Sequence, residues 1–213
     1  MALQLSRLSK TYGSQQVIPP LDMSFSPEDR VAILGGNGSG KSTLIQLLAG
    51  NIQASTGSFL LNGMEPVISH SGPEVHLLDM LTVQETLEFH GSLRLMRRMA
   101  SFEHLDLPAS AQHKRIKQLS SGMKQRVMLA LAIWTEADVL LLDEPCSHMD
   151  AAGMAWYNEQ LLNNLAATPR HSHRIALIAS NHHPEEVKHC KRAINPNGED
   201  VTLPGFNTNT QNN

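Results

Sequence analysis

One segment of this sequence carries the residue types needed to hold a phosphate chain. Glycines allow successive backbone N–H groups to turn toward phosphate oxygens, and the N-terminus of a following helix adds positive potential. Lys41 can reach the β- and γ-phosphates, and Ser42 offers a hydroxyl to Mg²⁺. A glycine-rich turn before an ordinary helix would explain neither residue. The segment that predicts a phosphate and Mg²⁺ site reads Gly35, Gly36, Asn37, Gly38, Ser39, Gly40, Lys41, Ser42.

Two adjacent acids, Asp143 and Glu144, follow the apolar run 139–142. The C-terminal end of a buried strand beside a phosphate loop is where a second Mg²⁺ contact belongs, which assigns Asp143 to the metal. Glu144 could polarise the attacking water. Two acids at a strand end are by themselves commonly a solvated loop, but the phosphate loop upstream favours the catalytic interpretation.

The elements that must position these residues are visible in the hydropathy pattern. Continuous apolar runs at 31–34, 139–142 and 175–179 predict buried strands. Helical spacing predicts helices from Ser42 to Gly50 and over 81–99, 120–134 and 151–166, and Thr82 and Glu85 match a capping box. Weak alternation in the first thirty residues predicts antiparallel strands. Apolar strands alternating with helices indicate an α/β fold with a mostly parallel sheet.

The segment 119–126, which reads LSSGMKQR, lies between the phosphate loop and the acids. It is similar to a variant of the LSGGQ signature of the ATP-binding cassette (ABC) family. The order of the other motifs also resembles that family, with Tyr12 before the phosphate loop, the acids after the signature, and a late histidine. A serine N-cap on an ordinary helix would explain Ser120 or Ser121 alone, but not the joint pattern.

The resemblance covers roughly residues 2 to 190 and implies a fold. It implies a P-loop NTPase core with a mostly parallel sheet, an N-terminal antiparallel β subdomain and a short helical subdomain that carries the signature. We therefore expect an ABC ATPase domain over residues 1–204. The polar tail 205–213 is rich in Asn and Thr, and we expect it to be disordered.

The resemblance also implies the nucleotide-binding and metal-binding residues. Tyr12 would stack on the adenine, and the segment from Gly35 to Thr43 would hold the phosphates and Mg²⁺. Asp143 would bind Mg²⁺ through water. Ser120 and Gly122 would contact the γ-phosphate bound by the opposite subunit, because a helix N-terminus offered in trans completes the site only when two subunits close.

The resemblance implies Glu144 as the general base and a switch histidine late in the chain. Matching Pro-Glu-Glu to the family assigns that histidine to His182, the interpretation we favour, whereas matching the preceding strand puts Asn181 there. The family usually has a glutamine between the phosphate loop and the signature, and we expect Glu74 to be its counterpart here. A carboxylate can meet a metal but donates no hydrogen bond, so metal binding or subunit coupling there is open.

The implied function is that of the ATP-hydrolysing subunit of an ABC transporter, with ATP and Mg²⁺ as its ligands. A separate transmembrane subunit and a second cassette, identical or not, would be its partners. The motifs look like those of short exporter-type subunits such as the ATP-binding subunit of the haem exporter. We expect the chain in the cytoplasm, peripheral on the inner face of the cell membrane.

Composition supports this class. The net charge of −3 gives no basic surface for nucleic acid, and two cysteines make no disulfide framework. The start lacks a secretory pattern, and the longest apolar run, 127–134, is shorter than the roughly 20 residues of a membrane span.

Three alternatives remain open. A soluble ABC ATPase acting on nucleic acid or ribosomes typically has two cassettes or a long insertion. A nucleotide kinase would need no signature. A regulatory cassette that binds but does not hydrolyse ATP is disfavoured by Glu144 and kept open by Glu74.

Overall fold

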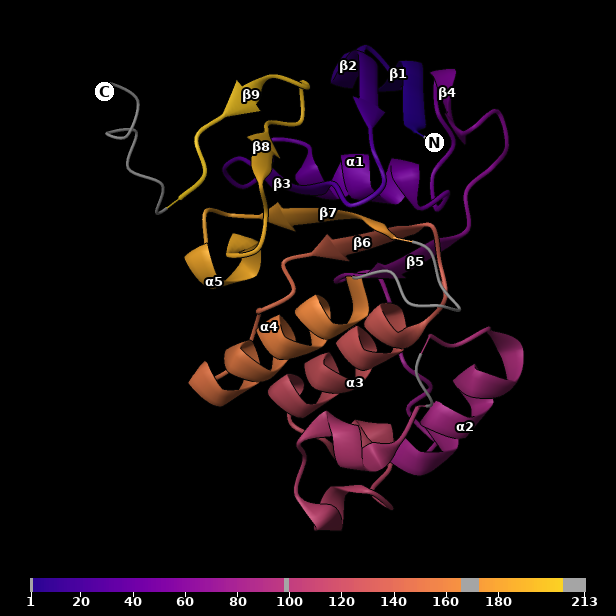
Figure 1. Cartoon of the computed structure of the whole chain (residues 1–213), viewed down its shortest axis with the longest axis vertical. Helices are drawn as coiled ribbons and strands as arrows, with labels where there is room; N and C mark the ends of the chain where they lie inside the picture. Colours follow the sequence, from indigo (N-terminus) through magenta and orange to yellow (C-terminus); the bar gives the residue numbers. More distant parts are fainter. Residues whose placement is uncertain (1, 98–99, 166–172, 205–213) are drawn as a thin grey trace.

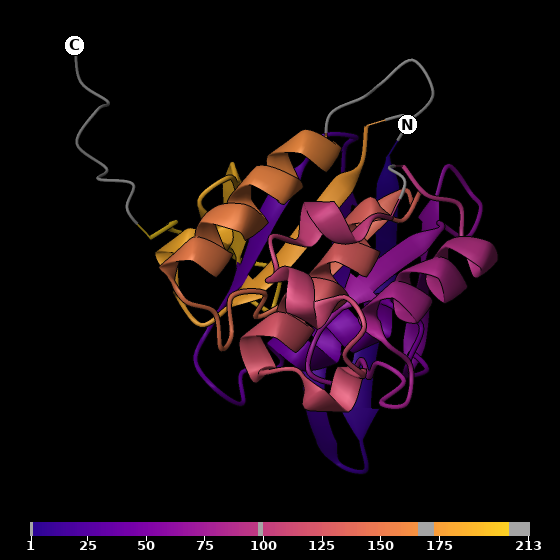
Figure 2. The ribbon, with the colours of Figure 1, turned by 90° about the horizontal axis from the view of Figure 1, so that it is seen from below.

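The computed structural model describes residues 2–97, 100–165 and 173–204. It is built in layers: a small antiparallel sheet, helix α1, a larger sheet, and then the helices α3 and α4 (Figure 1). Helix α2 and three short 3₁₀ helices lie beyond α3. Seen from below, α2, α3 and α4 all lie on the same side of the larger sheet (Figure 2). The tail 205–213, expected to be disordered, lies outside the described residues.

The strands form two sheets. The antiparallel sheet has the order β2-β1-β4, with bounds Leu3–Tyr12 for β1, Gln15–Phe25 for β2 and Thr56–Leu61 for β4. The larger sheet has the order β5-β6-β7-β3-β8-β9 and is parallel except for β9. Its strands are β3 Arg30–Leu34, β5 Ile68–Ser71, β6 Val139–Asp143, β7 Ile175–Ser180, β8 Arg192–Ile194 and β9 Asp200–Val201.

The helices mostly follow the predicted spacing. Their bounds are α1 Lys41–Leu48, α2 Val83–Leu93, α3 Ser121–Trp134, α4 Ala151–Leu165 and α5 Pro184–Val187, with 3₁₀ helices at Phe102–Leu105, Ala109–Ala111 and Ile116–Gln118. The predicted capping box is present at the start of α2, where the Thr82 side chain accepts from the Glu85 N–H and the Glu85 carboxylate accepts from the Thr82 N–H. No helix among the described residues is long and apolar enough to cross a membrane.

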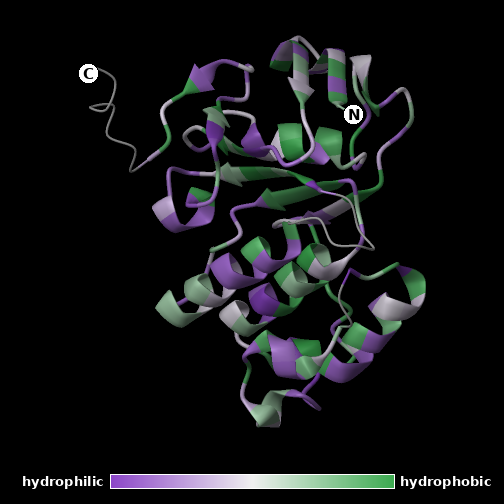
Figure 3. Ribbon diagram, viewed as in Figure 1, coloured by the Kyte–Doolittle hydropathy of each residue, from purple (hydrophilic) through white to green (hydrophobic). Residues whose placement is uncertain are grey.

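The central strands of the larger sheet are buried on both faces, which explains their continuous apolar runs. Successive side chains of a strand point to opposite faces. In β6, Val139 and Leu141 pack toward α1 and the antiparallel sheet, whereas Leu140 and Leu142 pack toward α3 and α4. The middle of the sheet is accordingly hydrophobic along its length (Figure 3). Two cores therefore fix the strand ends to which the phosphate loop and the acids are attached.

The helix predicted over 81–99 is too long. Helix α2 ends at Leu93, and Arg94 is already extended, with φ −128° and ψ 142°. Met96 then forms a bridge with Thr135, and the Arg97 N–H donates to the Trp134 carbonyl at 2.7 Å. Backbone pairing with the end of α3 therefore replaces the last predicted turns.

Candidate functional site: a phosphate loop with two adjoining strand ends

The phosphate loop joins β3 to α1, as predicted. Gly38 and Gly40 have φ values of 77° and 101°, a region that favours glycine. Gly40 is the N-cap of α1, and a Cβ there would lie 3.3 Å from the Val17 carbonyl oxygen of β2. The antiparallel sheet therefore packs directly on the phosphate loop. Glycine is needed at position 40 because of the positive φ and because a side chain would meet the Val17 carbonyl.

Lys41 is held across the loop. Its side chain is 5% exposed, and Nζ donates hydrogen bonds to the carbonyl oxygens of Gly35 at 2.7 Å and Gly36 at 3.1 Å. The ammonium charge therefore lies at the concave side of a backbone turn that leads into a helix N-terminus. Both features attract an anion.

Asp143, at the end of β6, lies beside the start of α1. It is 4% exposed, and among the described residues its Oδ1 has no hydrogen-bond partner. Burial raises the pKa of Asp143, while a hydrogen bond from Ser42 opposes that rise. A buried carboxylate oxygen left unpaired beside a hydroxyl is a donor set of hard oxygens, which suits Mg²⁺. Ser42 and Asp143 therefore fit the metal site expected from the sequence.

Glu144 is partly buried in the turn that follows β6. Its N–H donates to the Ala179 carbonyl of β7 at 2.9 Å, and its φ is 48°. A left-handed conformation at a residue other than glycine costs about 1–2 kcal/mol, and such residues are common at functional sites. The turn therefore holds the Glu144 carboxylate next to Asp143, whose pKa it raises further.

The loop after β7 reaches the phosphate loop. Asn181 Nδ2 donates to Asn37 Oδ1 at 3.2 Å, and His182 follows with φ 60° and an exposed side chain. Both candidates for the switch position therefore lie on the loop that touches the phosphate loop. The assignment of His182 stays a prediction.

Glu74 lies on the loop that leaves β5, the neighbour of β6. A Cβ at Gly72 would approach the Asp143 Cβ to 2.9 Å, so this loop packs tightly against the metal-site acid. Glu74 is exposed, and its negative charge is one of the causes that raise the pKa of Asp143. Glu74 is therefore close enough to act on the same site, and its correspondence to the family's glutamine stays a prediction.

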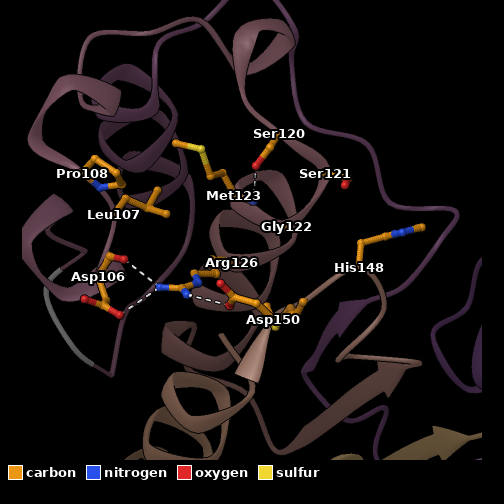
Figure 4. Close-up of a pocket in the computed structure, with 11 residues that line it drawn as sticks. Asp106, Leu107, Pro108, Ser120, Ser121, Gly122, Met123, Arg126, His148 and Asp150 are labelled. Carbon is orange, nitrogen blue, oxygen red and sulfur yellow. Dashed lines mark hydrogen bonds and ion pairs between the residues drawn. The ribbon is translucent and has the colours of Figure 1, made fainter. Parts of the chain in front are cut away.

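The signature forms a separate site at the N-terminus of α3. Ser120 is the N-cap, and its Oγ accepts from the Met123 N–H at 3.3 Å. A Cβ at Gly122 would lie 2.8 Å from the His148 carbonyl oxygen. Both residues line a cavity of about 400 Å³ between α3 and the loop before α4 (Figure 4). No phosphate-loop residue is among the described residues that line it.

No pattern in the sequence points to the role of Arg126 in this cavity. Its Nη1 donates to the Asp106 carboxylate at 2.9 Å, and its Nη2 lies 3.4 Å from Asp150 Oδ1 (Figure 4). Asp150 in turn caps α4 by accepting from the Gly153 N–H at 2.7 Å. Arg126 thus ties the signature helix to the short helical subdomain and to α4, three segments whose meeting depends on the tertiary fold.

Tyr12 ends β1 and is 49% exposed. The Lys10 ammonium lies 4.7 Å from the centroid of its ring. The hairpin that carries Tyr12 is the one whose second strand packs on Gly40. An exposed ring near the phosphate loop can stack on a base, and the adenine contact stays a prediction.

Comparison with solved structures supports the fold. A bacterial ABC transporter cassette solved as a dimer superposes with a TM-score of 0.75 at 19% identity, covering 96% of this chain and all of that one. An ABC transporter ATP-binding protein from Pyrococcus furiosus gives 0.74 at 22% identity, covering 94% of this chain and all of that one.

The sequence is similar to those of curated ABC transporter ATP-binding proteins. The sulfate/thiosulfate import ATP-binding protein CysA of Thermosynechococcus vestitus is 34% identical over 165 residues, which is 71% of this chain and 49% of the relative. The taurine import ATP-binding protein TauB of Pseudomonas fluorescens is 34% identical over 173 residues, 75% of this chain and 66% of the relative. The chain thus spans about half the length of the first of these relatives.

The sequence profile of the ABC transporter family matches residues 18–147, from the strand that packs on the phosphate loop through Asp143 and Glu144 to the turn beyond them. This chain belongs to the ABC transporter family.

Proposed function

We propose that this chain binds Mg²⁺–ATP and hydrolyses it as the nucleotide-binding subunit of a membrane transporter. The observation that carries the proposal is the convergence of three strand ends. The phosphate loop after β3, the acids Asp143 and Glu144 after β6, and the loop of Asn181 after β7 meet at one edge of the parallel sheet. Such an edge is the usual ligand site of a parallel α/β sheet.

In this proposal the segment from Gly35 to Thr43 holds the phosphates, and Lys41 neutralises the β/γ-phosphate charge. Ser42 and Asp143 hold Mg²⁺, which when bound would supply positive charge to the phosphate oxygens. The unpaired buried oxygen of Asp143 supports that assignment. Tyr12 stacks on the adenine.

Glu144 accepts a proton from the attacking water, and His182 holds the reacting end of the nucleotide by hydrogen bonding. Ser120 and Gly122 contact the γ-phosphate bound to a second cassette, identical or related. Two facts support this division. Among the described residues, none of the phosphate loop lines the signature cavity, and the first turn of the helix of Ser120 has N–H groups that no carbonyl of its own helix can satisfy. A solved ATP-binding cassette that superposes on this chain with a TM-score of 0.72 at 19% identity is a dimer in a post-hydrolysis state bound to ADP and phosphate.

The proposal also includes a partner protein that spans the membrane. The relatives CysA and TauB are named as import ATP-binding proteins. Large apolar side chains are exposed on and beside α2, next to the loop of Glu74, and the set is Leu78, Met80, Phe89, Leu93 and Leu95. We assign this surface to the transmembrane subunit, which would place the chain at the inner face of the cell membrane.

Nucleotide binding is tested by Lys41→Ala. Losing a charge-assisted hydrogen bond of about 1.5–3 kcal/mol should weaken ATP binding by roughly tenfold or more in calorimetry. Lys117→Ala is the matched control, since Lys117 is exposed in the last 3₁₀ helix. This variant should bind ATP with wild-type affinity. Unchanged affinity in Lys41→Ala would remove the phosphate loop from the proposal.

The partner is tested by purifying the tagged chain from detergent-solubilised membranes and identifying what accompanies it. A protein with several membrane spans should co-purify with the wild type and be lost from Phe89→Glu. Ribosomal proteins in its place would favour the alternative of an ABC ATPase that does not act in transport.

A further inference from the structure

A buried carboxylate lies behind the proposed catalytic site without contributing to it directly. Glu186 is on α5, four residues after His182, and is 4% exposed. Burial raises its pKa, and hydrogen bonds from Ser180 and from the Cys146 N–H oppose that rise. Burying a carboxylate costs free energy unless it accepts hydrogen bonds. The segments that donate to the Glu186 carboxylate are therefore the segments that it joins.

The first of these segments is the turn after β6. The Cys146 N–H donates to Glu186 Oε1 at 3.0 Å. Cys146 comes two residues after Glu144, and the intervening Pro145 carbonyl accepts from Gln125 Nε2 at 3.0 Å. The turn that carries Glu144 is therefore fixed on its far side by Glu186.

The second segment is the end of β7. The Glu186 N–H donates to the His183 carbonyl at 3.2 Å, and the Ser180 hydroxyl is near enough to the Glu186 carboxylate to oppose the rise in its pKa. The His183 N–H donates to Ser180 Oγ at 3.0 Å, which leaves the hydroxyl hydrogen free to point at the carboxylate. Ser180 comes two residues before His182, so the loop of the proposed switch histidine is anchored at the same carboxylate.

The backbone of Glu186 is anchored too. The hydroxyl of Tyr157, a fully buried residue of α4, donates to the Glu186 carbonyl at 3.1 Å. This bond fixes α5 on α4 and so fixes the position of the Glu186 carboxylate relative to both the Glu144 turn and the His182 loop.

We propose that Glu186 is a positioning residue that sets the Glu144 turn and the His182 loop relative to each other. Glu144 and His182 both have left-handed backbones, with φ 48° and 60°. Such conformations persist where the surroundings determine them, and Glu186 is bonded to the segment beside each. The inference rests on the proposed ATPase function for its kinetic consequence, but its structural consequence can be measured without hydrolysis.

The kinetic test compares Glu186→Ala, Glu186→Gln and the neighbouring control Glu185→Ala in the full chain. Loss of positioning should lower kcat of Glu186→Ala by roughly tenfold to a hundredfold, with the KM for ATP nearly unchanged. Glu186→Gln should restore most of the activity, because its amide can accept from the Cys146 N–H and donate to Ser180 Oγ. Glu185→Ala should keep the wild-type kcat.

The structural test is amide hydrogen exchange of the same variants. In Glu186→Ala, exchange should speed up in both turns, at residues 144–148 and 180–183, while the phosphate loop is unchanged. Faster exchange in only one turn would overturn the proposal. If the alanine variant does not fold, Ser180→Ala removes the hydroxyl beside Glu186 together with the acceptor of the His183 N–H. It should still lower kcat and speed exchange at residues 180–183, while residues 144–148 keep their wild-type exchange.

Two kinetic outcomes would also overturn the inference. One is a folded Glu186→Ala with wild-type kcat. The other is a proportional loss of kcat, ATP affinity and melting temperature that glutamine does not rescue, since that pattern describes general destabilisation. A wild-type chain that hydrolyses no ATP would instead defeat the proposed function, and the exchange measurement would still decide whether Glu186 joins the two turns.

Discussion

At the scale of single residues, Glu74 is an acid close to the proposed metal site, at the position where we predict the counterpart of the family's glutamine. Its loop packs against Asp143 through Gly72, and its charge raises the pKa of that acid. Repulsion between two nearby carboxylates disfavours a third negative group, such as the γ-phosphate, beside them. An amide would keep an oxygen ligand, add a donor and remove one charge.

We therefore predict that Glu74→Gln keeps or raises ATPase activity. The measurement is kcat over a Mg²⁺ titration, with Glu159→Gln on α4 as the control for loss of a surface charge. A large drop in kcat for Glu74→Gln alone would show that the carboxylate has its own role at this site.

Residue types predicted the parts of the site that local chemistry defines. Lys41 and Ser42 are recognisable because a phosphate loop needs them at fixed places along the chain. Asp143 is recognisable because it follows a buried apolar strand, and the structure brings it to Ser42 and Lys41. Glu186 and Arg126 could not be predicted in this way. Each joins segments distant in sequence, and their side chains have no periodicity or motif that names their partners.

At the scale of elements, the position of the N-terminus of α3 depends on its close packing against the loop before α4. Gly122 leaves only 2.8 Å between a hypothetical Cβ and the His148 carbonyl oxygen, a backbone atom that cannot move aside easily. Gly91 offers the contrast, because a Cβ there would meet nothing within 4 Å and the residue lies inside α2.

The two glycines predict opposite outcomes. Gly91→Ala should stabilise the chain by about 0.5–1 kcal/mol, which raises the melting temperature by roughly 1–4 °C, since alanine is the better helix former. Gly122→Ala should lower the melting temperature and reduce ATPase activity by displacing the signature helix. Thermal melting and kcat of the two variants check this pair, and a Gly122→Ala variant as stable and active as the wild type would contradict the packing described here.

The sequence predicted the long helices and strands better than it predicted where they end or the order of the strands in the sheet. Continuous apolar runs identified β3, β6 and β7, because a sheet covered on both faces needs no polar positions. The end of α2 was wrong, since the pairing of Met96 with Thr135 is a tertiary contact. The position of β7 between β6 and β3 also depends on tertiary packing, yet it places the loop of Asn181 between the acids and the phosphate loop.

At the scale of the whole molecule, the proposed function requires one chain to carry two halves of a site that face different surroundings. One half is the phosphate loop with Asp143 and Glu144. The other is the exposed N-terminus of α3 at Ser120, in its own cavity. A γ-phosphate held by the first half of one chain can accept hydrogen bonds from the second half of another. A closed pair of chains would therefore bury two ATP molecules, and ADP would lack the bridging group.

The most direct test of this account is the mass of Glu144→Gln by light scattering at high protein concentration. The variant should bind ATP without hydrolysing it, so the closed pair should accumulate with Mg²⁺–ATP and double the mass, and it should remain a monomer with Mg²⁺–ADP. Adding Ser120→Arg should abolish the doubling, because its bulk would occupy the place of the phosphate. A Glu144→Gln chain that stays monomeric at saturating ATP, or that doubles equally well with ADP, would contradict the account.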